Sequence, residues 1–353
     1  MRILVYPKDG NPYQSLLYGA MKLQHAAVVR YCYVFPIIGV LPFLVYALWE
    51  RVRGTKLAHI HWPAFRVLQP FPFHLQFSSW LFKASLWWLQ LLGYKIVWTV
   101  HNVLPHEPQN TDDLTAARLM SQRSSAKIVH SSYTIQQMNE QGIDTTNMAV
   151  IPHGNYDGVY PEGVGRDAAR QKFGIADDEF VILFFGNIRP YKGIEALLDA
   201  FDTAQLPRTR LIIAGNCTDD ALRMQLEAAA QHPTIDFYNA YTPESEVEDF
   251  FTASDVVCLP FRAITTSGSV LLALGFGKPI IAPRMGALQD LPTNVGYLYD
   301  ATNPQALAES LHAARTATDL AAKAIAARSY ADSLSWDGIA TSTYELYETV
   351  LAD

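Results

Sequence analysis

The apolar residues of this chain follow two alternating patterns. Short uninterrupted apolar runs are typical of strands buried on both faces. They alternate with longer segments in which apolar residues recur every three or four positions, as they do in helices. Strands that alternate with helices form parallel sheets through right-handed crossovers. The pattern predicts strands at 3–6, 27–35, 58–62, 96–100 and 128–130 in the first half, and at 181–185, 211–214, 235–238, 256–260 and 280–282 in the second.

The two series of strands predict two domains, which agrees with a length of 353 residues. The fold class is therefore α/β, with two doubly wound, Rossmann-like domains facing a cleft. Residues 155–166, NYDGVYPEGVGR, are rich in Gly and Pro and are typical of a linker. We therefore expect one domain over 1–160 and a second over 161–335. Sheets of this kind bind ligands beyond the carboxyl ends of their strands, so the active site is expected in the cleft.

Two segments of the first half are unusually apolar. Residues 31–49 carry no charge and are long enough to span a membrane. One Gly and two Pro interrupt them, which favours a strand followed by a core or membrane-surface helix. Residues 75–92 predict a long aromatic helix. Its Trp80, Trp87 and Trp88, with Lys83 and Lys95 nearby, are typical of a helix at a lipid interface, and a buried helix with clustered Trp is the alternative.

Charge is unevenly distributed along the chain. Residues 1–155 carry 13 Lys and Arg against 7 Asp and Glu, a net charge of +6, whereas the remainder carries 14 against 27, a net charge of −13. A basic, aromatic half suits an anionic membrane surface, near which each basic residue contributes about 1 kcal/mol. Nucleic acid is not expected as a partner, because the chain has no basic run and no binding motif.

Two further features concern the compartment. The three cysteines are scattered and lack metal-ligand spacing, which indicates a reducing environment and argues against a zinc site. The first residues, MRILVYP, predict a strand rather than a signal peptide. We therefore expect a cytoplasmic protein.

The most informative segment is 180–202, FVILFFGNIRPYKGIEALLDAFD. A buried strand ends at Gly186, a short loop carries Arg189 and Lys192, and a helix begins after Gly193. The start of a helix offers free N–H groups and the positive end of the helix dipole, and two cations add charge. The segment predicts a site for an anion such as a diphosphate. Solvated basic residues in an ordinary turn are the alternative.

Several segments together carry a resemblance. In order, they are TVHNVLPHE, VIPHGN, FFGNIRPYKGIEALLDAF, RLIIAGN, ASDVVCLPF and GSVLLALGFGKPIIAP. They resemble the two-domain (GT-B) glycosyltransferases of the large bacterial mannosyl- and glucosyltransferase group. In that family the turn after the first strand of the second domain holds the donor diphosphate. The resemblance assigns this role to Gly186, Asn187, Arg189, Lys192 and Gly193, with Asn187 in place of the usual Arg.

The chain departs from the family at two acidic positions. The family has two glutamates separated by seven residues before the GKP turn, and here those positions hold Ile264 and Leu272. This departure weakens the inference of a retaining enzyme and favours an inverting one, like the β-mannosyltransferases of xanthan-type polysaccharide assembly. Hydroxyls and N–H groups at a helix start can bind phosphate or ribose, although a plain Ser N-cap is the alternative. The segment that would do so is Thr265, Thr266, Ser267, Gly268 and Ser269.

An inverting transfer needs a general base on the acceptor hydroxyl. Three residues at expected strand ends of the first domain are candidates, namely Asp9, His101 and Glu107. Asp9-Gly10 is also a common turn dipeptide, and the region of Glu107 is equally compatible with a simple loop. The resemblance also places further residues in the cleft or near the nucleotide base: Gly10, Asn102, His153, Gly154 and Tyr241. For His153, a linker residue that contacts no ligand is the alternative.

These observations predict a metal-independent glycosyltransferase at the inner face of the cell membrane. Its donor would be a GDP- or UDP-linked sugar of the mannose or glucose type, with no other cofactor, and its acceptor a lipid-linked oligosaccharide or polysaccharide. The fold implies that the last helix, 336–353, returns to the first domain. Two alternatives remain open: a catalytically silent relative that binds nucleotide sugars, and a soluble enzyme that acts on a small acceptor.

Overall fold

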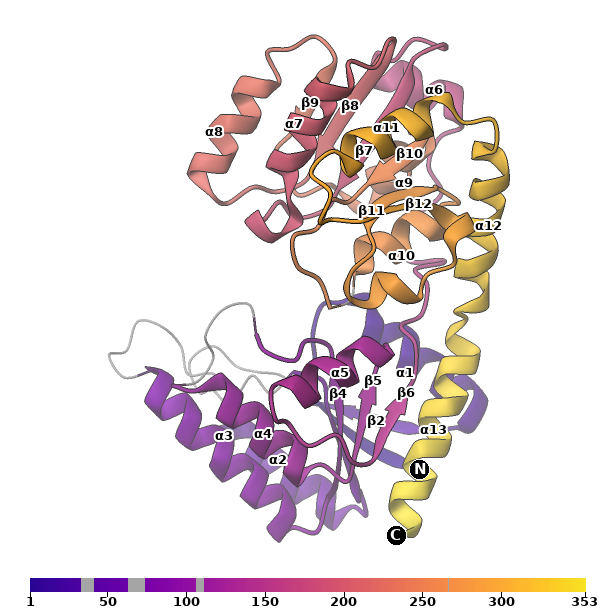
Figure 1. Ribbon diagram of the computed structural model, residues 1–353. Helices are drawn as coiled ribbons and strands as arrows, with labels where there is room; N and C mark the ends of the chain where they lie inside the picture. The colour runs from indigo at the N-terminus through magenta and orange to yellow at the C-terminus, as the bar shows by residue number, and fades with distance from the viewer. Residues whose placement is uncertain (33–40, 63–73, 106–110, 266) are drawn as a thin grey trace. The chain divides into compact units, whose positions relative to one another are not determined.

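The computed structural model describes residues 1–32, 41–62, 74–105, 111–265 and 267–353. They form two compact units (Figure 1). Unit 1 comprises Met1–Gly154 and Ser335–Asp353, and unit 2 comprises Asn155–Leu334. The chain therefore leaves unit 1 after Gly154 and returns to it at Ser335, near the boundaries expected at 160 and 335.

Unit 1 is built on a parallel sheet of six strands in the order β2-β1-β3-β4-β5-β6. Because β2 lies on one side of β1 and β3 on the other, the order of the strands reverses beside β1. Ligands of doubly wound sheets bind at such a switch point, beyond the carboxyl ends of the strands. The strands are β1 (Arg2–Tyr6), β2 (Val28–Tyr31), β3 (Leu57–Ile60), β4 (Lys95–Val100), β5 (Ala126–Val129) and β6 (Met148–Val150).

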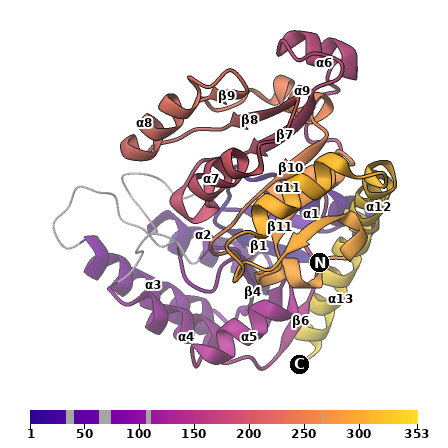
Figure 2. The same ribbon diagram turned by 45° about the horizontal axis from the view of Figure 1, so that its top comes forward.

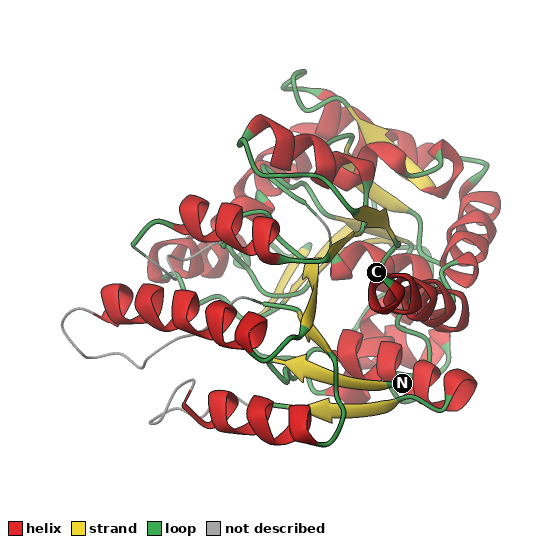
Figure 3. Ribbon diagram, turned by 90° about the horizontal axis from the view of Figure 1, so that it is seen from below, coloured by secondary structure: helices red, strands yellow, loops and turns green. Residues whose placement is uncertain are grey.

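Helices cover both faces of this sheet, as Figure 3 shows. On one face, α1 (Pro12–His25) packs against the last helix, α13 (Trp336–Ala352), so the end of the chain belongs to unit 1. The other face carries the core contributed by α2 (Leu41–Val52), α3 (His74–Leu91) and α4 (Asp113–Arg123). A further helix, α5 (Ser132–Glu140), precedes β6.

Unit 2 has a second parallel sheet of six strands, in the order β12-β11-β10-β7-β8-β9. Its switch point lies between β7 and β10, since the later strands extend from β7 in opposite directions. The strands are β7 (Phe180–Phe185), β8 (Thr209–Ala214), β9 (Ile235–Tyr238), β10 (Val256–Cys258), β11 (Ile280–Pro283) and β12 (Gly296–Tyr299).

Three pairs of helices are in contact in unit 2: α7 with α11 and α6 with α9, as Figure 2 shows, and α10 with α12. Short 3₁₀ turns complete the unit. The elements are α6 (Arg166–Lys172), η1 (Pro190–Lys192), α7 (Ile194–Ala204), α8 (Asp220–Ala229), α9 (Glu244–Ala253), α10 (Gly268–Gly275), η2 (Gly286–Asp290), η3 (Thr293–Val295), α11 (Ala306–Thr316) and α12 (Leu320–Ser333).

The prediction of two doubly wound parallel sheets is confirmed. The expected strands are present, but two edge strands, β6 and β12, were not predicted. Both have only three or four residues and are only partly buried. The strand expected at 256–260 ends at Cys258, two residues before Pro260, which has no N–H for a sheet hydrogen bond. The parts of the predictions that fall on 33–40 lie outside the described residues.

Among the helices of the described residues, none is long and apolar enough to cross a membrane. The sequence predicted that the apolar segment 31–49 divides into a strand followed by a helix. In agreement, Tyr31 ends β2 and residues 41–49 belong to α2.

Candidate functional site

The turn after β7 brings a glycine, a lysine and a serine together. Gly186 has a φ of +113°, which favours glycine, and a Cβ built there would lie 2.9 Å from Ser269 Oγ and 3.0 Å from Lys192 Nζ. Lys192 comes from η1 and Ser269 from the first turn of α10. The three residues therefore meet beyond the ends of β7 and β10, at the switch point of unit 2.

Lys192 is a buried cation, with only 7% of its surface exposed. Its Nζ lies 3.5 Å from Ser269 Oγ and 5.9 Å from the ring centroid of Phe184. Within the described residues, no carboxylate forms an ion pair with Lys192 or with Arg189. Burial, and secondarily the charge of Arg189, lower the Lys192 pKa to about 8. A buried ammonium beside a second cation is costly unless an anion compensates it, so this geometry favours anion binding.

Arg189 is held by backbone carbonyl groups. Its guanidinium Nη1 donates to the carbonyl oxygen of Ile188 at 2.8 Å and, more weakly, to that of Asn216 at 3.4 Å. These bonds leave the side chain half-buried beside the turn. Asn187, which replaces the family's usual Arg, is exposed at the same turn. The two cations therefore come from one loop, as the sequence predicts.

The start of α10 supplies the hydroxyl side of the site. Ser267 is the N-cap, and its side chain accepts a hydrogen bond from the N–H of Val270 at 3.3 Å, so the plain capping alternative describes this residue. Gly268 packs closely against Tyr156, because a Cβ at Gly268 would lie 2.7 Å from the Tyr156 hydroxyl. Ser269 is the following residue of α10 and reaches Lys192.

Three further residues were predicted for donor binding, namely Thr265, Thr266 and Tyr241. Thr265 accepts a backbone hydrogen bond from Ala287 N at 3.3 Å, and Thr266 lies outside the described residues. Tyr241 is exposed, in the segment between β9 and α9.

Ile264 and Leu272 occupy the two positions that hold glutamate in the resembled family. Ile264 packs against Gly286, where a Cβ would lie 2.2 Å from the Ile264 carbonyl oxygen. Leu272 is buried on α10 and lines a pocket of about 470 Å³ together with Tyr156, Tyr160 and Glu248. Neither Ile264 nor Leu272 can therefore supply the carboxylate that the family has at its position.

Unit 1 carries a cluster of histidines at the carboxyl ends of four neighbouring strands. His61 follows β3, His101 follows β4, His130 follows β5 and His153 follows β6. The ring of Tyr13 on α1 lies among them, with centroid distances of 4.9 to 5.6 Å to each imidazole. We call these five residues, together with His59 of β3, the histidine cluster.

A chain of hydrogen bonds runs through part of the histidine cluster. The Tyr18 hydroxyl lies 2.6 Å from His59 Nδ1 and 2.8 Å from His61 Nε2. His61 Nδ1 in turn lies 3.2 Å from His101 Nε2. Tyr347 of α13 approaches His59 Nδ1 at 2.5 Å, and His59 Nε2 meets Thr99 Oγ1 at 2.7 Å. The orientation of the His101 ring is fixed from this side, and Trp62 stacks on it at 4.3 Å.

The imidazoles of the cluster are held in the neutral form. Burial lowers the pKa of His59 and His153 to about 3 and that of His130 to about 4. Burial also brings the pKa of His61 and His101 well below the usual value, and the neighbouring histidines add to the effect. Neutral imidazoles each keep one nitrogen lone pair that can accept a hydrogen bond. No group of histidine, cysteine and acidic residues in the described chain has the geometry of a metal site.

Among the predicted residues of unit 1, the structure brings His101 and His153 into this cluster. Gly154 is required for packing, since a Cβ there would lie 2.4 Å from the Trp336 indole. Asn102 is half-buried directly after His101. Asp9 lies in the loop between β1 and α1, where its Oδ1 accepts the N–H of Asn11, and Gly10 is exposed beside it. This is the turn geometry that the sequence allowed for Asp9, and Glu107 lies outside the described residues.

Sequence reasoning missed His59, His61 and His130, and the tyrosines Tyr13, Tyr18 and Tyr347. The sequence did contain a signal for the histidines. A histidine lies at or just after an expected strand in HIHW, TVHN and IVHS, and in IPHG it follows a short segment beside such a strand. The tyrosines carried no such signal, since each lies on a helix with ordinary apolar spacing.

Residues 165–328 match the family "Glycosyl transferases group 1". The chain is 29% identical over 282 residues to GDP-mannose:glycolipid 4-beta-D-mannosyltransferase from Xanthomonas campestris pv. campestris, covering 76% of this chain and 75% of the relative. It is 26% identical over 234 residues to D-inositol 3-phosphate glycosyltransferase from Streptomyces griseus subsp. griseus, covering 60% and 48%.

Solved structures agree over the whole chain. Sucrose-phosphate synthase from Thermosynechococcus elongatus superposes with a TM-score of 0.77 at 18% identity, covering 99% of both chains. Anabaena HepE, solved with UDP-glucose, gives 0.73 at 18% identity and covers 100% of both. These similarities define the fold as GT-B. Residues 165–328 form a glycosyl transferases group 1 domain, and the protein is a glycosyltransferase, as the resemblance in its sequence predicted.

Proposed function

We propose that this glycosyltransferase transfers a mannose-type sugar from a nucleoside-diphosphate donor to a lipid-linked oligosaccharide or polysaccharide acceptor. The main support is the 29% identity to a GDP-mannose:glycolipid mannosyltransferase, which extends over three quarters of both chains. GDP-mannose is therefore the first donor to test, and UDP-glucose the second, because HepE was solved with that sugar nucleotide.

The donor diphosphate binds at the turn after β7. As the bond between the anomeric carbon and the phosphate oxygen breaks, negative charge grows on the leaving diphosphate. Lys192 and Arg189 lie where preset cations would stabilise that charge, and the α10 N-terminus adds N–H groups. Two protein cations meet the electrostatic need, so we propose a transfer that requires no divalent metal.

The acceptor reacts from the side of unit 1. Its hydroxyl oxygen attacks the anomeric carbon and its proton passes to a base of the protein. Ile264 and Leu272 offer no carboxylate at the family positions, which supports direct, inverting displacement. Asp9, His101 and Glu107 remain the candidates predicted for the base. Of these, His101 belongs to a buried hydrogen-bonded network whose histidines are neutral.

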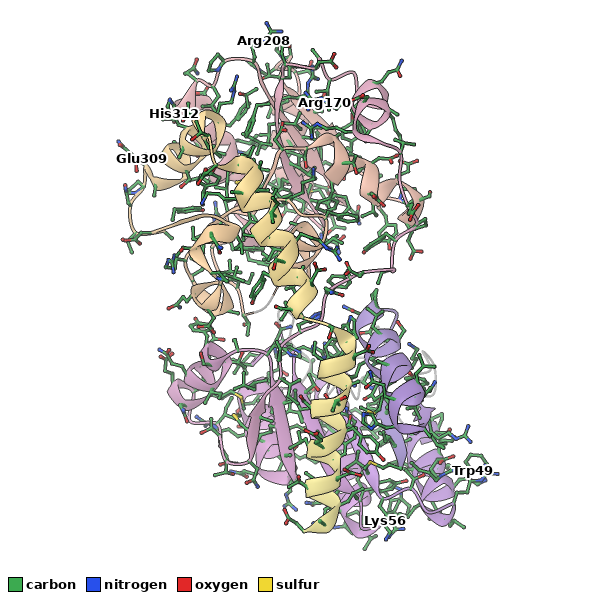
Figure 4. All side chains as sticks on the ribbon, turned by 90° about the vertical axis from the view of Figure 1, so that its right-hand side faces the viewer. Trp49, Lys56, Arg170, Arg208, Glu309 and His312 are labelled. Atoms are coloured by element: carbon green, nitrogen blue, oxygen red, sulfur yellow. The ribbon has the colours of Figure 1, made fainter. Side chains whose placement is uncertain are left out.

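The surface of unit 1 supports a membrane-bound acceptor. Four large apolar side chains at helical spacing on α3 point to solvent, with Trp80 61% and Trp87 60% exposed. Exposed apolar residues also lie on α2, whose Trp49 projects away from the ribbon in Figure 4. We call this set the aromatic surface: Val45, Leu48, Trp49, Val52, Phe77, Trp80, Trp87 and Leu91.

Basic residues accompany the aromatic surface. Lys83 lies on α3, and Arg53 stacks over the Trp49 ring with 3.5 Å between the guanidinium carbon and the ring centroid. Exposed apolar patches bordered by polar residues mark interaction sites, and Trp with Lys or Arg suits an anionic lipid interface. We propose that unit 1 docks on the anionic inner face of the cell membrane, where a lipid-linked acceptor is presented.

The function is tested by two assays on the full chain. A thermal-shift screen compares GDP, UDP, ADP and their sugars, because a ligand at 100 times its Kd stabilises by about 2.7 kcal/mol. Transfer of radiolabelled mannose from GDP-mannose to a lipid-linked oligosaccharide extract is then measured with and without EDTA. Transfer that survives EDTA supports the proposal. No stabilisation by any nucleotide, together with no transfer to any lipid-linked acceptor, would refute it.

A further inference from the structure

His130 has one nitrogen satisfied and one without a partner. It follows β5 directly and is only 8% exposed. Nδ1 lies 2.9 Å from the carbonyl oxygen of Ile151. Since a carbonyl can only accept, Nδ1 carries the proton, and Nε2 therefore holds the lone pair. The backbone of the chain itself thus fixes the tautomer of this imidazole.

Nε2 of His130 is buried and has no hydrogen-bond partner among the described residues. Leaving a buried polar atom unpaired costs about 1–3 kcal/mol, so such an atom requires an explanation. Two other histidines of the cluster differ in this respect: His59 and His61 each use both ring nitrogens. His130 therefore differs from His59 and His61, whose ring nitrogens all take part in the hydrogen-bonded chain.

The position of His130 indicates what the missing partner is. Its ring lies 5.3 Å from that of His101, 5.4 Å from that of Tyr13 and 5.5 Å from that of His153, at the carboxyl edge where doubly wound sheets bind ligands. A neutral imidazole with a fixed lone pair can accept from a hydroxyl but cannot donate to one at that nitrogen. A carbohydrate hydroxyl fits this requirement, and an anion does not.

We propose that His130 is a substrate-contacting residue whose Nε2 accepts a hydrogen bond from a hydroxyl of the acceptor sugar other than the attacking one, so that the attacking hydroxyl keeps its proton for the general base. This inference rests on the proposed function, because it assigns the acceptor to unit 1. The hydrogen bond fixes the position and orientation of the acceptor sugar on unit 1. Burial keeps the His130 pKa low, so Nε2 remains unprotonated and able to accept throughout the neutral pH range.

Two substitutions separate this role from a structural one. In His130→Asn, the side-chain amide can still donate to the Ile151 carbonyl from the position of Nδ1, but nothing occupies the position of Nε2. In His130→Gln, the amide reaches the position of Nε2 and the bond to Ile151 is lost. The proposal predicts that His130→Asn lowers transfer about 100-fold and that His130→Gln is the more active of the two. A purely structural histidine predicts the opposite order.

The assays are transfer to the lipid-linked acceptor, GDP affinity by calorimetry, and thermal unfolding of each variant. We expect His130→Asn to keep wild-type GDP affinity and melting temperature while transfer falls. Wild-type transfer rates in His130→Asn, with wild-type protein active, would overturn this inference and leave the proposed function intact. Absence of transfer by wild-type protein would instead count against the proposed function.

A measurement on unmodified protein covers the case in which a variant does not fold. Protein labelled with ¹⁵N-histidine is titrated with acceptor, and the His130 Nε2 resonance is assigned by its loss in either variant or by through-bond correlation. Formation of a hydrogen bond should shift this signal towards that of a hydrogen-bonded acceptor nitrogen at saturating acceptor. An unchanged resonance, as expected if a buried water alone satisfies Nε2, would overturn the proposal.

Discussion

The ammonium group of Lys192 lies 3.5 Å from the hydroxyl of Ser269. The two residues belong to different elements, the turn after β7 and the first turn of α10, which meet where the strand order of unit 2 reverses. Their contact places a buried cation and a helix start around one point. A diphosphate at that point would receive charge from Lys192 and hydrogen bonds from both elements.

Removing the Lys192 ammonium should weaken donor binding. A hydrogen bond to a charged group contributes roughly 1.5–3 kcal/mol, so we expect Lys192→Ala to lower kcat/KM about 10- to 100-fold and to weaken nucleotide affinity similarly. Steady-state kinetics and calorimetry check this. Lys278→Ala is the matched control, because Lys278 is a second cation of unit 2 whose pKa burial lowers to about 8, and it bonds instead to the Ser254 carbonyl. Equal nucleotide affinity in both variants would contradict the assignment.

Nucleotide affinity should fall as the pH rises through about 8. Burial and Arg189 lower the Lys192 pKa to about 8, so the free protein loses this charge above that pH, while a bound diphosphate favours the charged form. We expect an affinity about 10-fold weaker at pH 9.5 than at pH 7, with proton uptake on binding near pH 8.5. Lys192→Arg keeps its charge and should abolish this dependence. The same pH profile in both proteins would exclude Lys192 as the titrating group.

The histidine cluster should make unit 1 sensitive to acid. Its imidazoles have folded pKa values below that of an unfolded histidine, about 3 for His59 and His153 and about 4 for His130. Between pH 6.5 and 4 the unfolded state therefore binds more protons than the folded state, and the free energy of unfolding falls as the pH falls. Each such histidine adds about 1.4 kcal/mol per pH unit to the slope.

Tryptophan fluorescence measures this effect in unit 1 alone, because all 7 tryptophans lie in the segments 1–154 and 335–353. Urea unfolding at pH 7, 6 and 5 should show a progressive loss of stability. His59→Phe should reduce the slope, whereas His232→Gln, at an exposed site of unit 2, should leave it unchanged. A slope of zero between pH 6.5 and 5 would show that the cluster is not buried as described.

The aromatic surface should carry membrane binding. Trp80→Ser combined with Trp87→Ser removes two exposed indoles, and we expect binding to vesicles containing phosphatidylglycerol to fall at least about 10-fold. Co-flotation with vesicles measures this. Ile325→Ser, at a residue of α12 that is 72% exposed, is the control and should float as the wild type does. Equal flotation of all three proteins, or none by the wild type, would remove the membrane from the account.

The sequence predicted some features of this protein well and others not at all. Uninterrupted apolar runs such as 181–185 predicted the central strands because burial on both faces leaves no polar positions. The anion turn was predictable for a similar reason, since Gly186, Lys192 and Gly193 lie within eight residues of one another. The contact of Lys192 with Ser269 spans 77 positions and follows only from the strand order.

The histidine cluster shows the limit most clearly. Tyr347 reaches His59 from 288 positions away, because α13 packs on unit 1 beside α1. The partner that His130 Nε2 lacks could not be inferred from residue types at all, since it depends on which nitrogen Ile151 engages. The pattern of apolar residues predicts where the strands lie along the chain. Hydrogen bonds between elements also depend on the order of the strands within the sheet, which that pattern does not give.

The central claim is that the turn after β7 holds a nucleoside diphosphate, and a structure of the full chain with GDP or UDP bound tests it most directly. The account predicts diphosphate oxygens within hydrogen-bond distance of Lys192 Nζ, with Ser269 and the start of α10 on the other side. A nucleotide bound elsewhere, with its phosphates in contact with neither Lys192 nor Arg189, would contradict it.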